Sequence, residues 1–422
     1  MTPEQDNELQ IIGGLLRNPA EIARVDVNAD DFTLDLAMRA FAAMRAIVAA
    51  GGSVDVFGVA ERLGGGLMVG ELAAVWKECL IRPENLAERC ARLKARSRGR
   101  QTTRLLNLAI ATLEEGKDPD AVRARLIAAL AGLDTGGSNH THTARETMSL
   151  VTDYLQAAFD ARQGGGLVGV PSGIRGLDSL MGGFHKSDLI VIGARPGMGK
   201  TALMGSIAHH AATQGRRIGI ASAEMPAVQL GLRMASALGD IHSTKLRACD
   251  LDDNEFARLH DAASRYARLP ILIYDKPACT PADVALQARA WQLSGGLDLL
   301  FVDYLTRLSP DDRDDSRTRE VGRMVQSLKT LAKALDIPVV CFAQLSRVCE
   351  QRADKRPVMS DLRDSGEIEQ EADCVAFLYR DSVYNEQADP ESAEILIEKN
   401  RHGPCAQVLC RFIPETMTWT NA

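Results

Sequence analysis

One stretch of the chain combines an apolar strand, a glycine-bearing turn and a helix. Residues 189–192 are four consecutive apolar residues, and an apolar-periodic run covers residues 202–212. Between them lies the turn Ala194-Arg195-Pro196-Gly197-Met198-Gly199-Lys200-Thr201. A turn of this kind presents backbone N–H groups to phosphate, and the N-terminus of the following helix attracts negative charge. The stretch therefore predicts a loop that binds the phosphates of a nucleoside triphosphate.

Two side chains of this loop have separate predicted roles. Lys200 is expected to contact the β- and γ-phosphates of ATP, and the Thr201 hydroxyl is expected to hold Mg²⁺. The strict pattern has glycine six positions before the lysine, where this chain has Ala194. The alternative is a chance Gly-Lys pair at the start of a helix, but the flanking strand and helix favour the binding loop.

Bulk properties limit the class of protein. The chain of 422 residues is longer than a domain with a single hydrophobic core usually is, so two or three domains are expected. No apolar run of about 18 residues exists, the first residues are polar, and the nine cysteines lack Cys-x-x-Cys spacing. We therefore expect a cytoplasmic protein with reduced thiols and no membrane partner. The net charge of −7 does not favour nucleic-acid binding, although a local basic lining is compatible with it.

The first part of the chain has helical patterning. Leu9, Ile12 and Leu16 fall on one helical face, and residues 134–142 have the composition of a linker. Thr143 and Glu146 then spell a capping box for a helix that ends at the glycines 164–166. We predict an all-α N-terminal domain over 1–135 and a linker with a docking helix over 136–170. An amphipathic helix between two linkers needs a partner surface, and a neighbouring copy of the chain is one candidate.

Strands and helices alternate after residue 167. The expected strands cover 188–193, 217–223, 270–274, 298–303, 337–343, 374–379, 394–399 and 406–412. This alternation predicts an α/β domain over 171–422 with a mostly parallel sheet. The last two segments flank His402-Gly403-Pro404, so we expect them to form a hairpin.

Three polar residues that end apolar strands are candidates for nucleotide chemistry. Asp303 has the Walker B position of an acid that supports Mg²⁺, although aspartate also commonly starts turns. Glu224 follows another strand; if that strand lies beside the first, Glu224 faces the γ-phosphate and polarises water. The alternative for Glu224 is a helix N-terminal charge. Gln344 is a candidate sensor of the γ-phosphate, or a surface amide.

Two cations near the C-terminus could also contact a phosphate. Lys399 and Arg401 flank Asn400 directly after an apolar strand. Solvation is the usual fate of surface lysine and arginine, so their spacing alone leaves both interpretations open. In a ring of identical subunits, these side chains would act on the nucleotide of the next subunit, as arginine fingers do.

Two polar insertions are candidate nucleic-acid loops. Residues 311–323 contain four arginines among five acids, and residues 346–366 contain Arg347, Arg352, Lys355, Arg356 and Arg363. Neither insertion carries an aromatic residue for base stacking. The pattern favours contacts to the phosphate backbone without sequence readout, or two solvated surface loops.

The motifs together resemble one family. The phosphate loop, Ala223-Glu224-Met225-Pro226, Phe342-Ala343-Gln344-Leu345-Ser346-Arg347 and Asp361-Leu362-Arg363-Asp364-Ser365-Gly366 closely resemble the replicative helicases of the DnaB family. So do Phe377-Leu378-Tyr379-Arg380 and Lys399-Asn400-Arg401-His402-Gly403-Pro404. Alanine at position 194 is typical of that family's loop. The resemblance is dense from about residue 170 to 415 and weaker in the N-terminal region, which suggests a phage-borne or otherwise divergent member.

The resemblance implies a specific machine. A RecA-like P-loop NTPase domain would form a homohexameric ring, and the N-terminal domains would form a collar upon it. The ring would translocate on single-stranded DNA and unwind the duplex at the replication fork, with a primase and a helicase loader as partners of the primosome.

The family's site residues carry over onto this sequence one by one. Lys200, Thr201 and Asp303 would bind phosphates and Mg²⁺, and Glu224 would activate water. Gln344 would couple the γ-phosphate to the DNA loops. Lys399 and Arg401 would act in trans, and Arg233 would lie near the nucleotide. The DNA backbone would contact Arg363, Asp364 and Gly366.

Two other classes of protein compete with this interpretation. A RecA- or RadA-type strand-exchange ATPase fits the segment Ser172-Gly173-Ile174-Arg175-Gly176-Leu177-Asp178, but not the N-terminal helices or the pair Lys399 and Arg401. A non-catalytic adaptor that binds a helicase would be expected to lose Lys200 or Glu224, and this chain keeps both.

Overall fold

The chain divides into two compact units in the computed structural model, Met1–Met148 and Ser149–Ala422. The structure describes residues 2–22, 24–81, 85–119, 122–123, 125–126, 129–130, 143–164, 166–303, 317–362 and 365–422. The linker predicted over residues 134–142 lies outside these ranges. None of the helices in the described ranges combines the length and the apolarity needed to cross a membrane.

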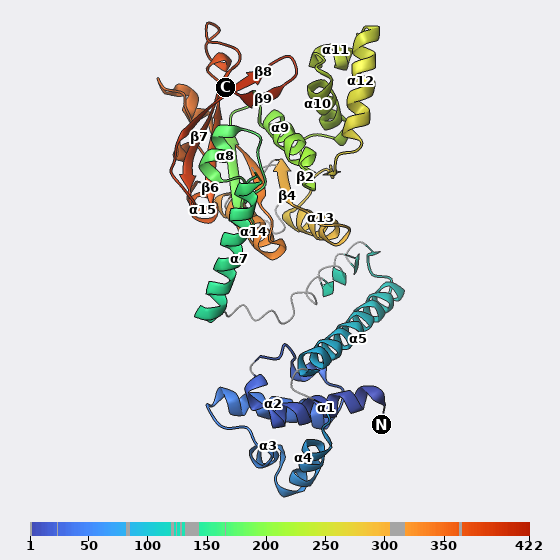
Figure 1. Ribbon diagram of the computed structural model, residues 1–422. Coiled ribbons are helices and arrows are strands. Elements are labelled where there is room, and N and C mark those ends of the chain that lie inside the picture. The colour runs from blue at the N-terminus through green and yellow to red at the C-terminus, as the bar shows by residue number, and fades with distance from the viewer. Residues whose placement is uncertain are drawn as a thin grey trace. The chain divides into compact units, whose positions relative to one another are not determined.

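The first unit is helical, as predicted. Its helices are α1 (Pro3–Arg17), α2 (Asp35–Ala49), α3 (Val56–Leu63), α4 (Gly66–Glu78) and α5 (Leu86–Glu114) (Figure 1). Ile11, Ile12, Phe41 and Met44 form the centre of its core. Glu8 is also buried, and its carboxylate accepts hydrogen bonds from the backbone N–H groups of residues 33 and 34. A buried acid on α1 thus stabilises the N-terminus of α2.

The helix α7 (Ala144–Gln163) begins at the predicted capping box. The backbone N–H of Glu146 donates to Thr143 Oγ1 at 3.3 Å, and the backbone N–H of Thr143 donates to Glu146 Oε2 at 2.7 Å. Large apolar side chains remain exposed along this helix: Met148, Leu150, Val151, Tyr154, Leu155 and Phe159. Its predicted docking role stays a prediction.

The second unit is built on one mixed sheet. Within the described residues the strand order is β3-β2-β4-β5-β1-β6-β7-β8-β9. The strands are β1 (Leu189–Ala194), β2 (Ile218–Ser222), β3 (Ile271–Tyr274), β4 (Leu299–Asp303), β5 (Val339–Gln344), β6 (Cys374–Tyr379), β7 (Ser392–Asn400), β8 (Gln407–Ile413) and β9 (Thr418–Asn421). The first six pair in parallel, and β7, β8 and β9 continue the sheet antiparallel.

Helices cover the parallel strands, which explains their apolar sequences. All residues of β1, β2, β4 and β6 are buried, as expected for strands with both faces covered. The helices are α8 (Arg175–Met181), α9 (Lys200–Thr213), α10 (Ala227–Gly239), α11 (Ser243–Ala248), α12 (Asp253–Tyr266), α13 (Pro281–Leu293), α14 (Arg317–Leu335) and α15 (Ser365–Glu371). Among them, α10, α11 and α12 form a group beside the sheet (Figure 1).

Two features of the sheet were not given by the sequence. The final strand β9 was not predicted, so the expected hairpin of β7 and β8 is followed by a third antiparallel strand. The strand β2 does not lie beside β1, because β4 and β5 stand between them. The order of strands in a sheet is decided by long-range packing and not by their order along the chain.

Candidate functional site

The predicted phosphate loop lies between β1 and α9. Gly197 and Gly199 adopt positive φ angles of 85° and 95° there. A Cβ atom on Gly199 would lie 2.9 Å from Trp419 Nε1 and 3.0 Å from the Phe412 ring. Both the backbone conformation and the close approach therefore require glycine at position 199.

Side chains from distant elements hold the loop backbone. Trp419 Nε1, on β9, donates to the carbonyl oxygen of Gly199 at 3.0 Å. Arg380, which follows β6, donates through Nη1 to the carbonyl oxygen of Gly197 at 3.3 Å, and its guanidinium stacks 3.7 Å from the centre of the Phe412 ring. No role was predicted for Arg380, Phe412 or Trp419, because only the positions of β6, β8 and β9 in the sheet bring them to the loop.

Some of the predicted loop residues are buried in the protein, and others are exposed. Ala194 and Met198 are fully buried, whereas Pro196 and Gly197 are exposed. Arg195 is buried, and its guanidinium donates to Glu350 Oε1 at 2.7 Å and to the carbonyl oxygen of residue 345 at 2.8 Å. Its charged group is therefore engaged with the segment after β5. A direct contact of Arg195 with the nucleotide stays a prediction.

Lys200, Thr201, Asp303 and Glu224 meet at the start of α9. Thr201 Oγ1 donates to Asp303 Oδ2 at 3.3 Å. Burial lowers the pKa of Lys200, although Asp303 and Glu224 both act against that shift. Burial likewise raises the pKa of Asp303 to about 6, opposed by the nearby charge of Lys200. The Lys200 and Asp303 charges are thus both poorly hydrated, and the charge of Glu224 acts on them from nearby.

The second oxygen of Asp303 identifies a place for a cation. Asp303 is 0% exposed, and its Oδ1 atom has no hydrogen-bond partner among the described residues. A buried carboxylate oxygen without a partner is costly unless a ligand satisfies it. Hard divalent cations such as Mg²⁺ take oxygen ligands, and the Thr201 hydroxyl lies beside this carboxylate. The residues present therefore fit Mg²⁺.

Glu224 comes near this site through β4, because the condition that β2 lies beside β1 is not met. The strand β2 pairs with β4, so that Ser222 lies opposite Asp303 and the backbone N–H of Ala223 donates to the carbonyl oxygen of Asp303 at 2.8 Å. Glu224 comes directly after this pair and is exposed. Its place near Lys200 and Asp303 therefore depends on β4 and not on contact between β2 and β1.

Gln344 and Arg233 approach the same end of the sheet. Gln344 is the last residue of β5 and pairs with Ala194, the last residue of β1. Arg233, on α10, and Thr201 both line a cavity of about 270 Å³. Burial lowers the pKa of Arg233, whereas the charge of Asp303 acts in the opposite direction. Gln344 therefore lies beside the end of β1, and Arg233 shares a cavity with Thr201; their roles towards the nucleotide stay predictions.

Lys399 and Arg401 lie at the opposite end of the sheet. Asn400 on β7 pairs with Cys374 on β6, which pairs with Ile190 near the start of β1. Ala194, where β1 ends, is about 13 Å further along the strand at about 3.3 Å per residue. Lys399 and Arg401 lie at the end of β7 that is distant from the phosphate loop of the same chain. Neither can therefore join Lys200 and Asp303 within one chain.

The structure constrains the predicted DNA loops only in part. Arg363, Asp364 and residues 311–316 of the first insertion lie outside the described residues, and Gly366 is exposed in the first turn of α15. In the other insertion Arg352 binds the carboxylate of Asp361, and Arg356 binds that of Glu394 at 2.8 and 2.7 Å. These two guanidinium groups are therefore engaged within the chain.

The fold and this site together define a class of protein. A mixed sheet with six neighbouring parallel strands, a phosphate loop after a central strand, and Asp303 beside Thr201 are the features of a P-loop nucleoside triphosphatase with a RecA-like domain. The family model described as the DnaB-like helicase C terminal domain matches residues 169–421. The chain belongs to this family.

Relatives and solved structures agree with that assignment. The chain is 40% identical over 275 residues to the "Replicative DNA helicase DnaB" of Geobacillus stearothermophilus, covering 64% of this chain and 61% of the relative. It is 39% identical over 260 residues to the "Replicative DNA helicase DnaC" of Bacillus subtilis, covering 61% and 57%. The matches thus span about three fifths of these relatives' own lengths.

Two solved structures are similar to different extents of the chain. One, described as a DnaB-like replicative helicase and its interactions with primase, has a TM-score of 0.67 and 26% identity over 99% of both chains. Another, described as an ATPase domain, has a TM-score of 0.63 and 32% identity, and covers 67% of this chain and 99% of its own. The first likeness extends over the N-terminal helices as well as the sheet.

Proposed function

We propose that this protein is an ATP-dependent replicative DNA helicase that translocates on single-stranded DNA and unwinds duplex at the replication fork. It acts in the cytoplasm as a homohexameric ring, in which residues 1–135 form a collar, 136–170 a linker with a docking helix, and 171–422 the motor. A primase and a helicase loader are its partners. Membership of the DnaB-like helicase family and the names of the relatives support this proposal.

One observation carries the ring assembly. The acids and Lys200 lie at the carboxyl end of the parallel strands, whereas Arg401 lies at their amino end. Phosphoryl transfer needs a cation at the charge that develops in the transition state. Because Arg401 cannot reach its own loop, the site is completed by Arg401 and Lys399 of another copy of the chain.

Each side chain then has a task in hydrolysis. Lys200 and the loop backbone bind the β- and γ-phosphates of ATP, and Glu224 orients and polarises the attacking water. Thr201 and Asp303 hold Mg²⁺, which when bound neutralises charge on the phosphates. Gln344, beside the loop at the end of β5, connects the γ-phosphate to the segment that leads to Arg363, Asp364 and Gly366, which track the DNA backbone. Arg233 contributes to the nucleotide pocket from α10.

Hydrolysis and unwinding assays test this proposal. The purified full-length protein is assayed for ATP hydrolysis, with and without single-stranded DNA, and for separation of a forked duplex. Glu224→Gln is expected to lower kcat by about 10²- to 10⁴-fold, with nucleotide binding kept. The control Glu115→Gln changes an exposed acid in the first unit, outside the nucleotide-binding unit, and should keep both activities. DNA-stimulated hydrolysis without strand separation, but with strand exchange, would favour the recombinase class instead.

A further inference from the structure

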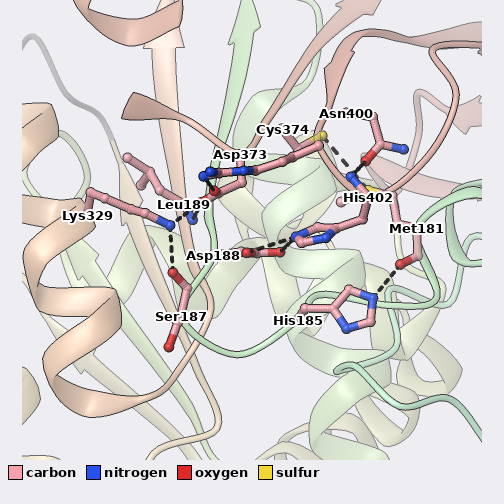
Figure 2. Close-up of polar contacts among 11 residues, drawn as sticks. Met181, His185, Ser187, Asp188, Leu189, Lys329, Asp373, Cys374, Asn400 and His402 are labelled. Carbon is pink, nitrogen blue, oxygen red and sulfur yellow. Dashed lines mark hydrogen bonds and ion pairs between the residues drawn. The ribbon is translucent and has the colours of Figure 1, made fainter. Parts of the chain in front are cut away.

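A buried carboxylate stands directly behind Arg401. Asp373 precedes β6 at the amino end of the sheet and is 2% exposed. Figure 2 shows it beside Lys329 on α14 and Leu189 on β1, with the pair Asp188 and His402 close by. A charged group buried at this depth needs partners, and its partners come from three separate elements.

The two carboxylate oxygens of Asp373 accept hydrogen bonds from different donors. Oδ2 accepts hydrogen bonds from the backbone N–H of Leu189 at 2.8 Å and from Lys329 Nζ. Oδ1 accepts from Arg401 Nη1 at 3.1 Å. Burial alone would raise the pKa of Asp373, but the hydrogen bonds from Lys329, Leu189 and Arg401 outweigh it and lower the pKa. Asp373 is therefore ionised at neutral pH and faces Arg401 with a full charge.

The main chain fixes Arg401 to the same residue. The backbone N–H of Arg401 donates to the carbonyl oxygen of Asp373 at 2.9 Å, and the backbone N–H of Asp373 donates to that of Leu189 at 2.9 Å. The Arg401 side chain is nevertheless 69% exposed. Asp373 thus restrains one edge of a guanidinium that has five N–H donors, and most of that group still faces outward.

The residues on either side of Arg401 are fixed as well. His402 Nε2 lies 2.9 Å from Asp188 Oδ2, and the backbone N–H of His402 donates to Asn400 Oδ1 at 3.1 Å (Figure 2). Lys399 Nζ donates to the carbonyl oxygen of Glu369 on α15. The turn that carries Arg401 is therefore anchored to β1, to α14 through Asp373, and to α15. Such anchoring is unusual for an exposed turn between two strands, because loops of this kind are commonly mobile.

We propose that Asp373 is a positioning residue for Arg401: it holds the guanidinium in the orientation that meets the nucleotide of the adjacent subunit. This inference rests on the proposed function, since it assumes that Arg401 acts in trans. Holding a charged group in place before the reaction removes the cost of ordering it, and a displacement of about 1 Å can cost about 10²-fold in rate.

The test needs a variant that loses the carboxylate without unfolding. Asp373→Asn alone would leave the amine of Lys329, whose side chain is 10% exposed, without its partner charge. The double variant Lys329→Met/Asp373→Asn removes both buried charges and keeps an oxygen for the N–H of Leu189. Lys329→Met is the matched control, because it lowers stability while keeping the contact between Asp373 and Arg401.

The readout is steady-state ATP hydrolysis by the full-length protein with single-stranded DNA, together with affinity for a fluorescent ADP analogue. We expect the double variant to lose about 10²-fold in kcat with KM and ADP affinity nearly unchanged. Lys329→Met should keep kcat within a few-fold of the wild type, at a lower melting temperature. In an Arg401→Ala background, the double variant should cost no further kcat, because Asp373 acts through Arg401.

The possible outcomes separate the two proposals. A wild-type kcat in the double variant, or a full additional loss on the Arg401→Ala background, would overturn the role of Asp373 and leave the trans role of Arg401 intact. A wild-type kcat in Arg401→Ala would overturn the trans role itself. If the double variant does not fold, Asp373→Glu keeps both charges and moves the carboxylate by one methylene group. It should lower kcat about tenfold without a change in KM, and an unchanged kcat would contradict the proposal.

Discussion

Two buried aspartates at opposite ends of one sheet have opposite electrostatics. Asp303, at the carboxyl end, has its pKa raised to about 6 by burial, and its Oδ1 atom has no partner among the described residues. Asp373, at the amino end, accepts three hydrogen bonds from side chains and backbone, which outweigh burial and lower its pKa. The Asp303 carboxylate is suited to binding a cation, and the Asp373 carboxylate is suited to anchoring the Arg401 side chain.

This difference shows how one subunit can hold two halves of a site. The carboxyl end brings Lys200, Thr201, Asp303 and Glu224 to the phosphate loop, and the amino end presents Arg401 outward from an anchored turn. Under the proposed function, each half lacks what the other supplies, and a complete site forms between two copies. The following predictions test this contrast, from the largest expected effect to the smallest.

Loss of Arg401 would show whether the amino end matters to hydrolysis at all. Arg401→Ala is expected to lower kcat by about 10³-fold or more, because arginine fingers contribute about 10³ to 10⁵. ADP binding should be kept, since the phosphate loop is untouched. Arg268→Ala, which changes an exposed arginine after α12, is the control. Equal kcat values for the two variants would show that Arg401, and with it the amino end of the sheet, takes no part in hydrolysis.

The raised pKa of Asp303 predicts a pH dependence of stability. Between its usual value of 3.8 and about 6, the folded protein keeps a proton that the unfolded chain releases. The free energy of unfolding of the metal-free wild type should therefore fall, relative to Asp303→Asn, as the pH rises from about 4 to about 6. The fall should be roughly 2 kcal/mol between these two pH values, and roughly 3 kcal/mol from well below the lower pKa to well above the higher one, at about 1.4 kcal/mol per pKa unit. Urea unfolding at several pH values measures it, and parallel pH curves for the two proteins would contradict it.

The shape of the phosphate loop should be intolerant of a single methyl group. Gly199→Ala places a Cβ atom at a φ of 95° and against Trp419 and Phe412. We expect a loss of about 1 to 3 kcal/mol, visible as weaker binding of the ADP analogue and a lower melting temperature. Gly231→Ala on α10, where no atom lies within 4 Å of an added Cβ, is the matched control. Unchanged binding in Gly199→Ala would mean that the loop adapts.

The smallest effect is expected from the support of the loop by β9. Trp419→Phe keeps most of the ring packing on Phe412 but removes the donor to the carbonyl oxygen of Gly199. We expect a destabilisation of about 1 kcal/mol in urea unfolding. A variant as stable as the wild type would show that the hydrogen bond contributes nothing to the loop.

The carboxyl end could be predicted well from the sequence, for physical reasons. The loop, Thr201 and Lys200 are local in the chain, and Asp303 ends a fully apolar strand. Such features follow from short-range rules of strand, turn and helix. The contact route of Glu224 could not be predicted, because it depends on β4 lying between β2 and β5.

The amino end could not be predicted in the same way. Asp373 resembles an ordinary polar residue before a strand, and Lys329 resembles a solvated lysine of an amphipathic helix. Their burial follows from α14 packing against β1 and β5. The strand β9 was missed because Thr418–Asn421 is short and largely polar, and its place is decided by pairing with β8 and by the contact of Trp419 with Gly199.

The measurement that tests the central claim most directly is subunit complementation. Differently tagged Glu224→Gln and Arg401→Ala proteins are co-expressed, and assemblies that contain both are isolated through the two tags. In such assemblies, some interfaces combine an intact Arg401 from one subunit with an intact Glu224 from the next. We predict ATP hydrolysis well above that of either variant alone. Mixed assemblies with no more activity than the separate variants would show that Arg401 does not complete the site of a neighbouring subunit.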